Sequence, residues 1–139
     1  MASELDWDTF HRRVHSSQPW RAVVVFEAPW CPACKRMRAP LDAFARLVSR
    51  HALKDVDGTI DVVRVNADYA YEAIQQAREI DRARFSGSFA RAIGAYPTVV
   101  FVDTGVPRLS NCALRALPRT ANDFVARSYA FFRRDGNRD

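Results

Sequence analysis

A buried-strand pattern that runs almost directly into two closely spaced cysteines constrains this chain more than any other feature. Residues 22–26 (AVVVF) are apolar and mostly β-branched, which is typical of a central strand covered on both faces. A Cys-Pro-Ala-Cys motif follows at residues 31–34, and a helical pattern of apolar side chains comes after it. Proline is well tolerated at the first helical position, because its missing N–H would have no helical partner there. The sequence therefore predicts that Cys31 and Cys34 lie where a central strand leads into a helix N-terminus.

This placement indicates a specific chemistry for the two cysteines. A cysteine at a helix N-terminus lies near unpaired backbone N–H groups and the positive end of the helix dipole, and both favour thiolate over thiol. Cys34 follows Cys31 by about one helical turn, so it can attack a mixed disulfide formed at Cys31. The motif therefore favours a redox-active dithiol in which Cys31 is the nucleophile and Cys34 is the resolving cysteine.

A metal site and two inert cysteines are the alternatives to this interpretation. Structural zinc sites take four ligands, and the other candidates are Cys112 and three histidines whose spacing matches no zinc motif. His11 and His15 are one turn apart on a predicted helix, but the sequence offers no obvious third ligand beside them. We therefore expect no metal and no other bound cofactor. Cys112 is interpreted as a small buried apolar residue, with a regulatory thiol as the alternative.

Composition limits the other possibilities. A chain of 139 residues with 48% hydrophobic residues suits one core, so we expect a single domain over residues 1–139. No apolar run approaches the roughly 18 residues of a membrane span, so we expect no membrane partner. The net charge of +5 is compatible with acidic partners, but the arginines are scattered, so nucleic-acid binding is not expected. The first residues do not resemble a secretory signal, which favours a cytoplasmic location.

The remaining sequence predicts alternating helices and strands. Helical segments are expected from Ser3 to before Pro19 and over residues 34–53, 71–84, 89–93 and 120–132, and strands over residues 22–26, 60–65, 98–102 and 108–117. A turn is expected at Asp57-Gly58, and the Asp-Thr-Gly turn at residues 103–105 joins the last two strands as a hairpin. This order indicates a mixed α/β layer structure with its parallel part first and a hairpin near the end.

Two segments resemble the thioredoxin superfamily. Residues 28–35 (APWCPACK) resemble the active-site segment of thioredoxins and protein disulfide isomerase domains. Residues 96–98 (YPT), followed by an apolar strand and an Asp-x-Gly turn, resemble the second conserved segment of the same superfamily. The two segments are independent and correctly ordered. The resemblance implies a thioredoxin-like three-layer sandwich, with a mixed central sheet, a C-terminal β-hairpin and helices on both faces.

The resemblance also implies a substrate-binding surface. It implies that Pro97 follows a cis peptide bond and faces the dithiol, so that backbone groups of Ala95 and Tyr96 can pair with an extended substrate. Trp30 is then a flat apolar platform beside Cys31, with core packing as the alternative. The substrate-binding residues implied in this way are Trp30, Pro32, Ala33, Ala95, Tyr96 and Pro97.

The activity implied by the resemblance is that of a thiol–disulfide oxidoreductase that acts on protein disulfides by dithiol/disulfide exchange. Its partners are then protein disulfide substrates and an electron-donating reductase or small thiol. Ala33 brings no charge that would stabilise a thiolate, so we expect a reducing or intermediate potential rather than a strongly oxidising one. The alternative is a thioredoxin-fold binding or assembly module in which the dithiol is incidental.

Two regions depart from the family pattern. Thioredoxins and isomerases usually carry a buried acid on the central strand where this chain has Val25. Side chains two apart on a strand share a face, so Glu27 is a candidate proton relay, and a solvated glutamate at a strand end is the alternative.

The segment between Asp68 and Pro97 is longer than the family needs, and it is basic over Arg78–Arg91. We expect this segment to extend the third helix and to form one wall of the substrate groove, where either an acidic partner or a solvated helix face would fit.

Overall fold

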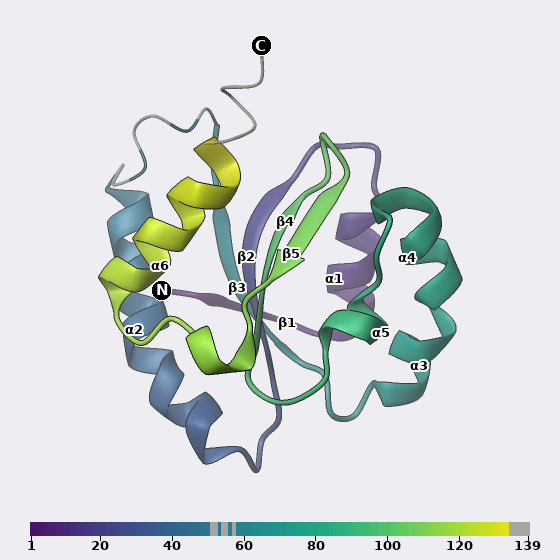
Figure 1. Ribbon diagram of the computed structural model, residues 1–139, viewed down its shortest axis with the longest axis horizontal. Helices are drawn as coiled ribbons and strands as arrows, with labels where there is room; N and C mark the ends of the chain where they lie inside the picture. The colour runs from purple at the N-terminus through teal and green to yellow at the C-terminus, as the bar shows by residue number, and fades with distance from the viewer. Residues whose placement is uncertain (51–52, 54–55, 57, 134–139) are drawn as a thin grey trace.

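A mixed β-sheet forms the middle layer of the protein (Figure 1). The computed structural model describes residues 1–50, 53, 56 and 58–133. Within these residues the strands are β1 (Ser3–Leu5), β2 (Arg21–Glu27), β3 (Asp61–Asn66), β4 (Thr98–Asp103) and β5 (Arg108–Asn111). They lie in the order β1-β3-β2-β4-β5. The pairs β1–β3 and β3–β2 are parallel, whereas β4 pairs antiparallel with both β2 and β5.

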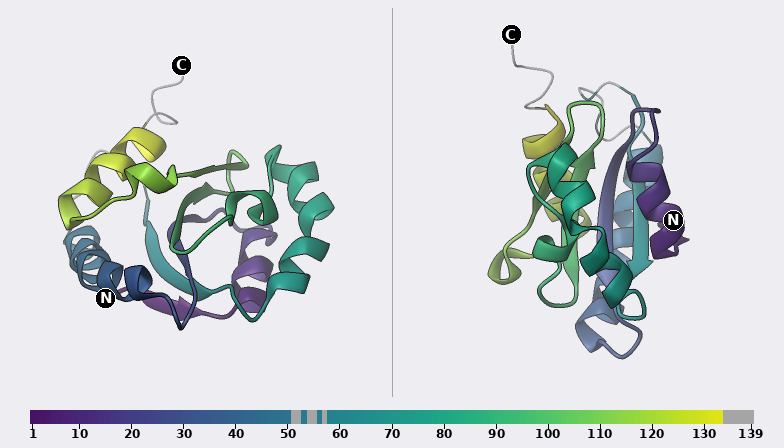
Figure 2. Two further views of the ribbon diagram at one scale, coloured as in Figure 1. Left: turned by 60° about the horizontal axis from the view of Figure 1, so that its bottom comes forward. Right: turned by 90° about the vertical axis from the view of Figure 1, so that its right-hand side faces the viewer.

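Helices cover both faces of this sheet (Figures 1 and 2). One face carries α2 (Pro32–Ser49) and α6 (Ala121–Ser128); the other carries α1 (Trp7–Val14), α3 (Tyr71–Gln76), α4 (Arg78–Phe85) and α5 (Phe89–Ala92). A 3-10 turn (Leu114–Ala116) precedes α6, and a π-helical turn (Tyr129–Arg133) follows it. None of the described helices is long and apolar enough to cross a membrane. The predicted three-layer α/β sandwich with a C-terminal hairpin is confirmed.

Alternation along β2 divides the apolar residues between two cores. Val23 and Val25 belong to the core under α2 and α6, in which the fully buried rings of Phe44 and Phe124 stack with centroids 5.4 Å apart. The alternate residues of β2, Ala22, Val24 and Phe26, belong to the core under α1 and α3–α5. Six of the seven residues of β2 are buried. The central strand predicted from the apolar run is therefore covered on both faces.

The predicted helix start at Ser3 is wrong. Residues 3–5 pair in parallel with residues 63–65, so they form the edge strand β1. The helix begins instead at Trp7, and its N-cap is Asp6, whose carboxylate accepts a backbone N–H of the first turn at 2.7 Å. A three-residue edge strand is too short to show a periodic pattern, whereas Ser3 and Asp6 both suit a helix start.

The long segment before Pro97 forms three short helices rather than one extended helix. The predicted helix over residues 71–84 is divided at Ala77, which separates α3 from α4. The predicted helical turn over residues 89–93 is present as α5. Phe85 and Phe89 anchor the segment in the core that also contains α1. This whole segment therefore lies on the face of the sheet opposite α2 (Figure 2).

Two other elements are shorter than predicted. The strand expected over residues 108–117 ends at Asn111, after which the chain takes the 3-10 turn toward α6. The helix expected over residues 34–53 ends at Ser49. The helix prediction over residues 51–52 and the Asp57 part of the predicted turn lie outside the described residues, as do residues 134–139 of the predicted domain.

Phe10 should be highly sensitive to truncation, because it lies in the core under α1. Its side chain is fully buried, and its ring centroid lies 5.2 Å from that of Phe89 and 5.4 Å from that of Phe26. We expect Phe10→Ala to lower the free energy of unfolding by about 3–5 kcal/mol, because it leaves a cavity between the helices and the sheet. Urea denaturation would measure the change.

Ile80→Ala is the control for this measurement, because that side chain is 59% exposed. It should change the free energy of unfolding by no more than about 0.5 kcal/mol. Equal losses in the two variants would show that Phe10 is not part of a tightly packed core.

Candidate active site

The two cysteines lie at the start of α2, just beyond the end of β2. Cys31 is the N-cap residue of α2 with extended backbone angles, and Pro32 occupies the first turn of the helix. The backbone N–H of Cys34 donates to Cys31 Sγ at 3.1 Å, so the sulfur takes the place of a capping oxygen. Both cysteines are free thiols. A sulfur that receives a helix N-terminal N–H is in a position where negative charge is favoured.

Cys34 is in a different electrostatic environment. Its side chain is buried, with 1% of the residue exposed, and Cys31 beside it is 3% exposed. Burial raises the pKa of the Cys34 thiol to about 12, and the hydrogen bond with Cys31 and the negative charge of Glu27 act in the same direction. Cys34 therefore keeps its proton at neutral pH. It becomes a nucleophile only when a base removes that proton.

The main chain before Pro97 lies against the dithiol. The Tyr96–Pro97 peptide bond is cis. The thiol of Cys31 donates to the carbonyl oxygen of Tyr96 with a sulfur–oxygen distance of 3.6 Å. Ala95 is exposed, Tyr96 is half-buried and Pro97 is buried. The structure thus brings the two segments that carry the family resemblance to one place.

Trp30 stands at the edge of this site rather than in the core. The residue is 65% exposed, so the core-packing alternative is wrong. Its indole N–H donates to Asp68 Oδ2 at 3.0 Å, and its ring meets that of Tyr96 edge-on with centroids 6.1 Å apart. Asp68 is not among the site residues predicted from the sequence. The signal was available, because Asp68 follows β3, whose end lies beside the end of β2 in register.

A groove of about 390 Å³ lies next to Pro97. Ala33 and Pro97 line it, and Pro32 is exposed at the helix start close by in the chain. The other wall was not predicted from the sequence, because the segment after β5 was expected to be a strand and instead forms a 3-10 turn. The further lining residues are Arg36, Met37, Pro40, Leu114, Leu117, Pro118 and Arg119. The groove is therefore apolar at its base and carries exposed arginines.

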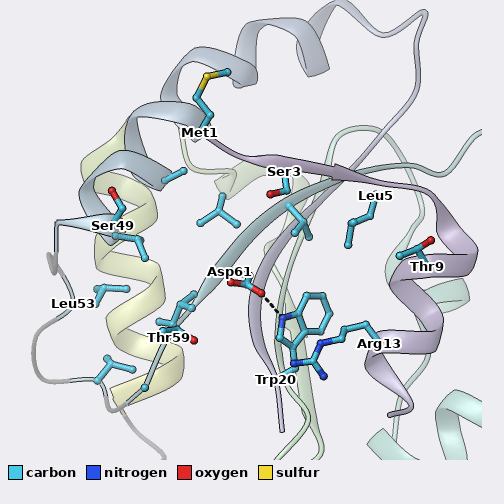
Figure 3. Close-up of a pocket in the computed structure, with 17 residues that line it drawn as sticks. Met1, Ser3, Leu5, Thr9, Arg13, Trp20, Ser49, Leu53, Thr59 and Asp61 are labelled. Carbon is cyan, nitrogen blue, oxygen red and sulfur yellow. Dashed lines mark hydrogen bonds between the residues drawn. The ribbon is translucent and has the colours of Figure 1, made fainter. Parts of the chain in front are cut away.

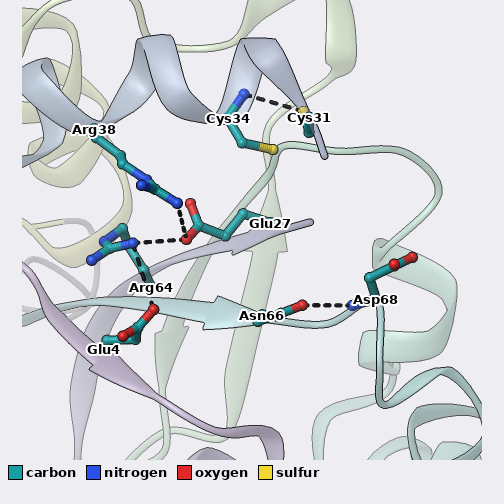
Figure 4. A network of polar contacts seen from close by, with 8 residues as sticks. All are labelled: Glu4, Glu27, Cys31, Cys34, Arg38, Arg64, Asn66 and Asp68. Carbon is teal, nitrogen blue, oxygen red and sulfur yellow. Dashed lines mark hydrogen bonds and ion pairs between the residues drawn. The ribbon is translucent and has the colours of Figure 1, made fainter. Parts of the chain in front are cut away.

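Glu27 is buried beneath α2, and the solvated alternative is wrong. The residue is 3% exposed, and its Oε1 accepts from Arg64 Nη1 at 2.8 Å and lies 3.4 Å from Arg38 Nη2 (Figure 4). Its other oxygen, Oε2, is buried and has no hydrogen-bond partner among the described residues. Val25 is equally buried on the same face of β2. A carboxylate therefore stands under the dithiol helix, two residues later on the strand than the family pattern places it.

A larger cavity of about 660 Å³ lies away from the cysteines (Figure 3). It is bounded by β1, α1, the start of β3 and the end of α2, and Trp20 Nε1 donates to Asp61 Oδ2 within it at 2.7 Å. Neither Cys31 nor Cys34 lines this cavity. It is therefore separate from the dithiol. Cys112 is also separate: it is buried against Arg127, and burial raises the pKa of its thiol.

Structures of known proteins share this architecture. ERdj5 (form II) matches with a TM-score of 0.62 and 19% identity over 94% of this chain, which spans only 14% of that protein. The Trx4 domain of ERdj5 matches with a TM-score of 0.60 and 21% identity, over 93% of each chain. Deadhead, a germline-specific thioredoxin of Drosophila melanogaster, matches with a TM-score of 0.58 and 20% identity, over 94% of this chain and 99% of its own. These likenesses show the fold.

A family model settles the relationship. The model described as Thioredoxin matches residues 2–115, which include the dithiol, the cis peptide bond and every strand of the sheet. The comparison with curated proteins gives no match. This chain belongs to the thioredoxin family.

Proposed function

We propose that this protein is a thiol–disulfide oxidoreductase that exchanges its Cys31/Cys34 dithiol with disulfides in protein substrates. Membership in the thioredoxin family and the likeness to thioredoxin and ERdj5 domains support an oxidoreductase in general. The observation that carries the proposal is the position of the Cys31 sulfur. It receives a helix N-terminal N–H and lies 3.6 Å from the Tyr96 carbonyl oxygen, in a residue of which 3% is exposed.

Reduction of a substrate disulfide would take two displacement steps. The Cys31 thiolate attacks one substrate sulfur, a mixed disulfide forms, and the other substrate sulfur leaves as a thiolate. Cys34 then loses its proton and attacks the Cys31 sulfur, which forms the Cys31–Cys34 disulfide and releases the second substrate thiolate. The substrate gains two electrons and the protein loses two. A partner reductase or a small thiol would return them.

The second step requires a base, because Cys34 is protonated at neutral pH. We assign this role to Glu27. Arg64 and Arg38 hold Oε1, which leaves the unpartnered oxygen Oε2 to exchange a proton with Cys34. The negative charge of Glu27 reaches Cys34, since it contributes to the raised pKa of that thiol.

The proposed substrate-binding surface consists of the exposed main chain before Pro97 and the apolar groove next to it. An extended substrate segment would pair with the exposed backbone at Ala95–Tyr96 and lie against the Trp30 ring. Its side chains would enter the apolar groove next to Pro97, where Arg36 and Arg119 favour acidic residues. A protein with a surface disulfide in a flexible acidic segment fits this site. A reducing or intermediate potential and a cytoplasmic location remain part of the proposal.

The two active-site thiols should have separable roles. We expect Cys31→Ser to lower insulin reduction, followed as turbidity with dithiothreitol, to the uncatalysed rate, because the attacking sulfur is gone. In the Cys34→Ser protein, Cys31 should still attack the substrate disulfide, but the mixed disulfide should accumulate because no second thiol resolves it. Intact-mass spectrometry would detect this species.

Cys112→Ala is the matched control for the loss of a thiol and should keep the full rate, because Cys112 lies outside the site. Full activity in Cys31→Ser would exclude Cys31 as the nucleophile. A binding or assembly module with an incidental dithiol would show instead no reduction of insulin above background by the unaltered protein.

Glu27→Gln tests the proton relay through its pH dependence. We expect the resolution step to slow by about tenfold or more near pH 7, because the Cys34 proton then has no base to accept it. The rate of the variant should rise with pH as the thiolate fraction of Cys34 grows, so the difference from the unaltered protein should narrow toward pH 10. Stopped-flow tryptophan fluorescence between pH 6 and 10 would follow both proteins.

A purely electrostatic role for Glu27 predicts the opposite sign. Loss of a negative charge that raises the pKa of Cys34 would lower that pKa and speed resolution near pH 7. The control is Glu4→Gln, at the exposed carboxylate 3.8 Å from the same Arg64, which should leave the pH profile unchanged. A faster Glu27→Gln protein would therefore refute the relay.

A further inference from the structure

We propose that His11, His15 and Asp81 form a binding site for a zinc-like divalent cation between α1 and α4. The two histidines lie one turn apart on α1, and Asp81 lies on α4, about seventy residues further along the chain. Each histidine Nε2 donates to the same oxygen, Asp81 Oδ1, at 2.7 and 2.8 Å. One ligand atom from each of the three residues lies within 4.8 Å of the others. In the part of the chain that the structure describes, no other three histidine, cysteine or acidic residues converge in this way.

The burial of Asp81 is the second observation that points to an ion. The side chain of Asp81 is completely buried, and its Oδ2 has no hydrogen-bond partner among the described residues. A buried carboxylate is costly unless its charge and its lone pairs are matched. The two histidine N–H groups satisfy one of its oxygens and leave the other unsatisfied. A divalent cation would balance the charge and could draw on either oxygen.

The donor set fits zinc or a neighbouring transition metal. Two imidazole nitrogens and one carboxylate oxygen are borderline ligands that Zn²⁺ binds at about 2.0–2.2 Å, and histidines four residues apart on a helix present their rings on one face. An ion would replace the two protons that now lie between Nε2 and Oδ1. Tetrahedral binding would lengthen each nitrogen–oxygen contact by about half an ångström. A water molecule would complete the four ligands.

The surroundings hold the imidazole rings and leave an entry path. The ring of His11 stacks on Trp7 with centroids 4.8 Å apart, and that of His15 meets Phe85 edge-on at 5.9 Å. Their side chains are 18% and 21% exposed, so both imidazoles are in partial contact with solvent, from which we expect an ion to enter. The rings are therefore oriented by packing before any ion arrives, which lowers the entropic cost of binding.

The nearby arginines are engaged elsewhere. Arg12 donates to the Asp8 carbonyl and to Thr9, and Arg13 donates to the carbonyls of residues 18 and 19. Arg84, next to Phe85 on α4, donates to the carbonyls of Val14 and Thr104. Among the described residues, these three arginines donate to main-chain carbonyls and a hydroxyl and not to Asp81. Their positive charge would weaken cation binding without blocking it.

A bound ion would join the segment that distinguishes this chain from its family to the body of the domain. Asp81 belongs to the long segment before Pro97, and α1 packs on the sheet. The site shares no residue with the dithiol, the groove or Glu27, so it is independent of the proposed function. By mass action the ion would stabilise the folded state, in which α1 and α4 are held together.

Metal titration of a variant without the reactive thiols would test this site. The Cys31→Ser/Cys34→Ser protein, free of any polyhistidine tag, removes the two active-site thiolates as competing ligands and leaves only Cys112, which is buried against Arg127. We expect it to bind one Zn²⁺ with micromolar or tighter affinity by isothermal titration calorimetry. His15→Ala or Asp81→Asn in that background should weaken binding by about tenfold or more, because each removes one ligand. The control Glu79→Gln, at an exposed carboxylate on α4, should not.

A second readout keeps the test valid if a variant folds poorly. Zn²⁺ added to the double-serine protein should shift the ring nitrogen resonances of two histidines in NMR spectra, and it should raise the melting temperature. Absence of saturable binding at micromolar Zn²⁺, or equal affinity in the His15→Ala and Glu79→Gln proteins, would overturn the proposal. The cluster would then be a hydrogen-bonded His–Asp–His contact only.

Discussion

The connection from β2 to α2 is the constraint on which the rest of this structure depends. β2 is buried on both faces and pairs with β3 on one side and β4 on the other, so its end is fixed in space. Cys31 then caps the helix through its own sulfur, which means that one hydrogen bond both starts α2 and orients the reactive atom. The same rigid strand end places Glu27 under the helix. Stability and reactivity therefore share one set of contacts.

The elements that sequence patterns predicted well are those with strong local signals. The apolar run of β2 and the start of the last helix at Ala121 appear close to their predicted bounds, and the hairpin from β4 to β5 is present although β5 ends earlier than expected. The edge strand β1 and the break at Ala77 were missed because neither carries such a signal. β1 is specified by pairing with β3, and Ala77, where α3 gives way to α4, is buried in the core under α1. Tertiary context decides both.

The site shows the same division between local and long-range information. The dithiol and the residues around Pro97 are contiguous motifs, and the sequence named all of them. The environment of Glu27 is not local: its partners Arg38 and Arg64 come from α2 and β3, and whether a glutamate at a strand end is buried depends on what covers it. The groove beyond Pro97 was missed for a similar reason, because its far wall is a 3-10 turn where a strand was expected.

The histidine cluster depends most strongly on contacts between residues far apart in the chain. His11 and His15 lie on one helix face, and the third ligand that a metal site needs is absent from the neighbouring sequence. It comes instead from Asp81, about seventy residues further along the chain in the long segment before Pro97. An aspartate fully buried between two imidazoles is expensive to maintain for packing alone, since an apolar residue would fill the same space without desolvating a charge. The long segment before Pro97 therefore has a physical role in this fold: it covers the face that bears α1 and supplies a carboxylate at the point where the two helices meet.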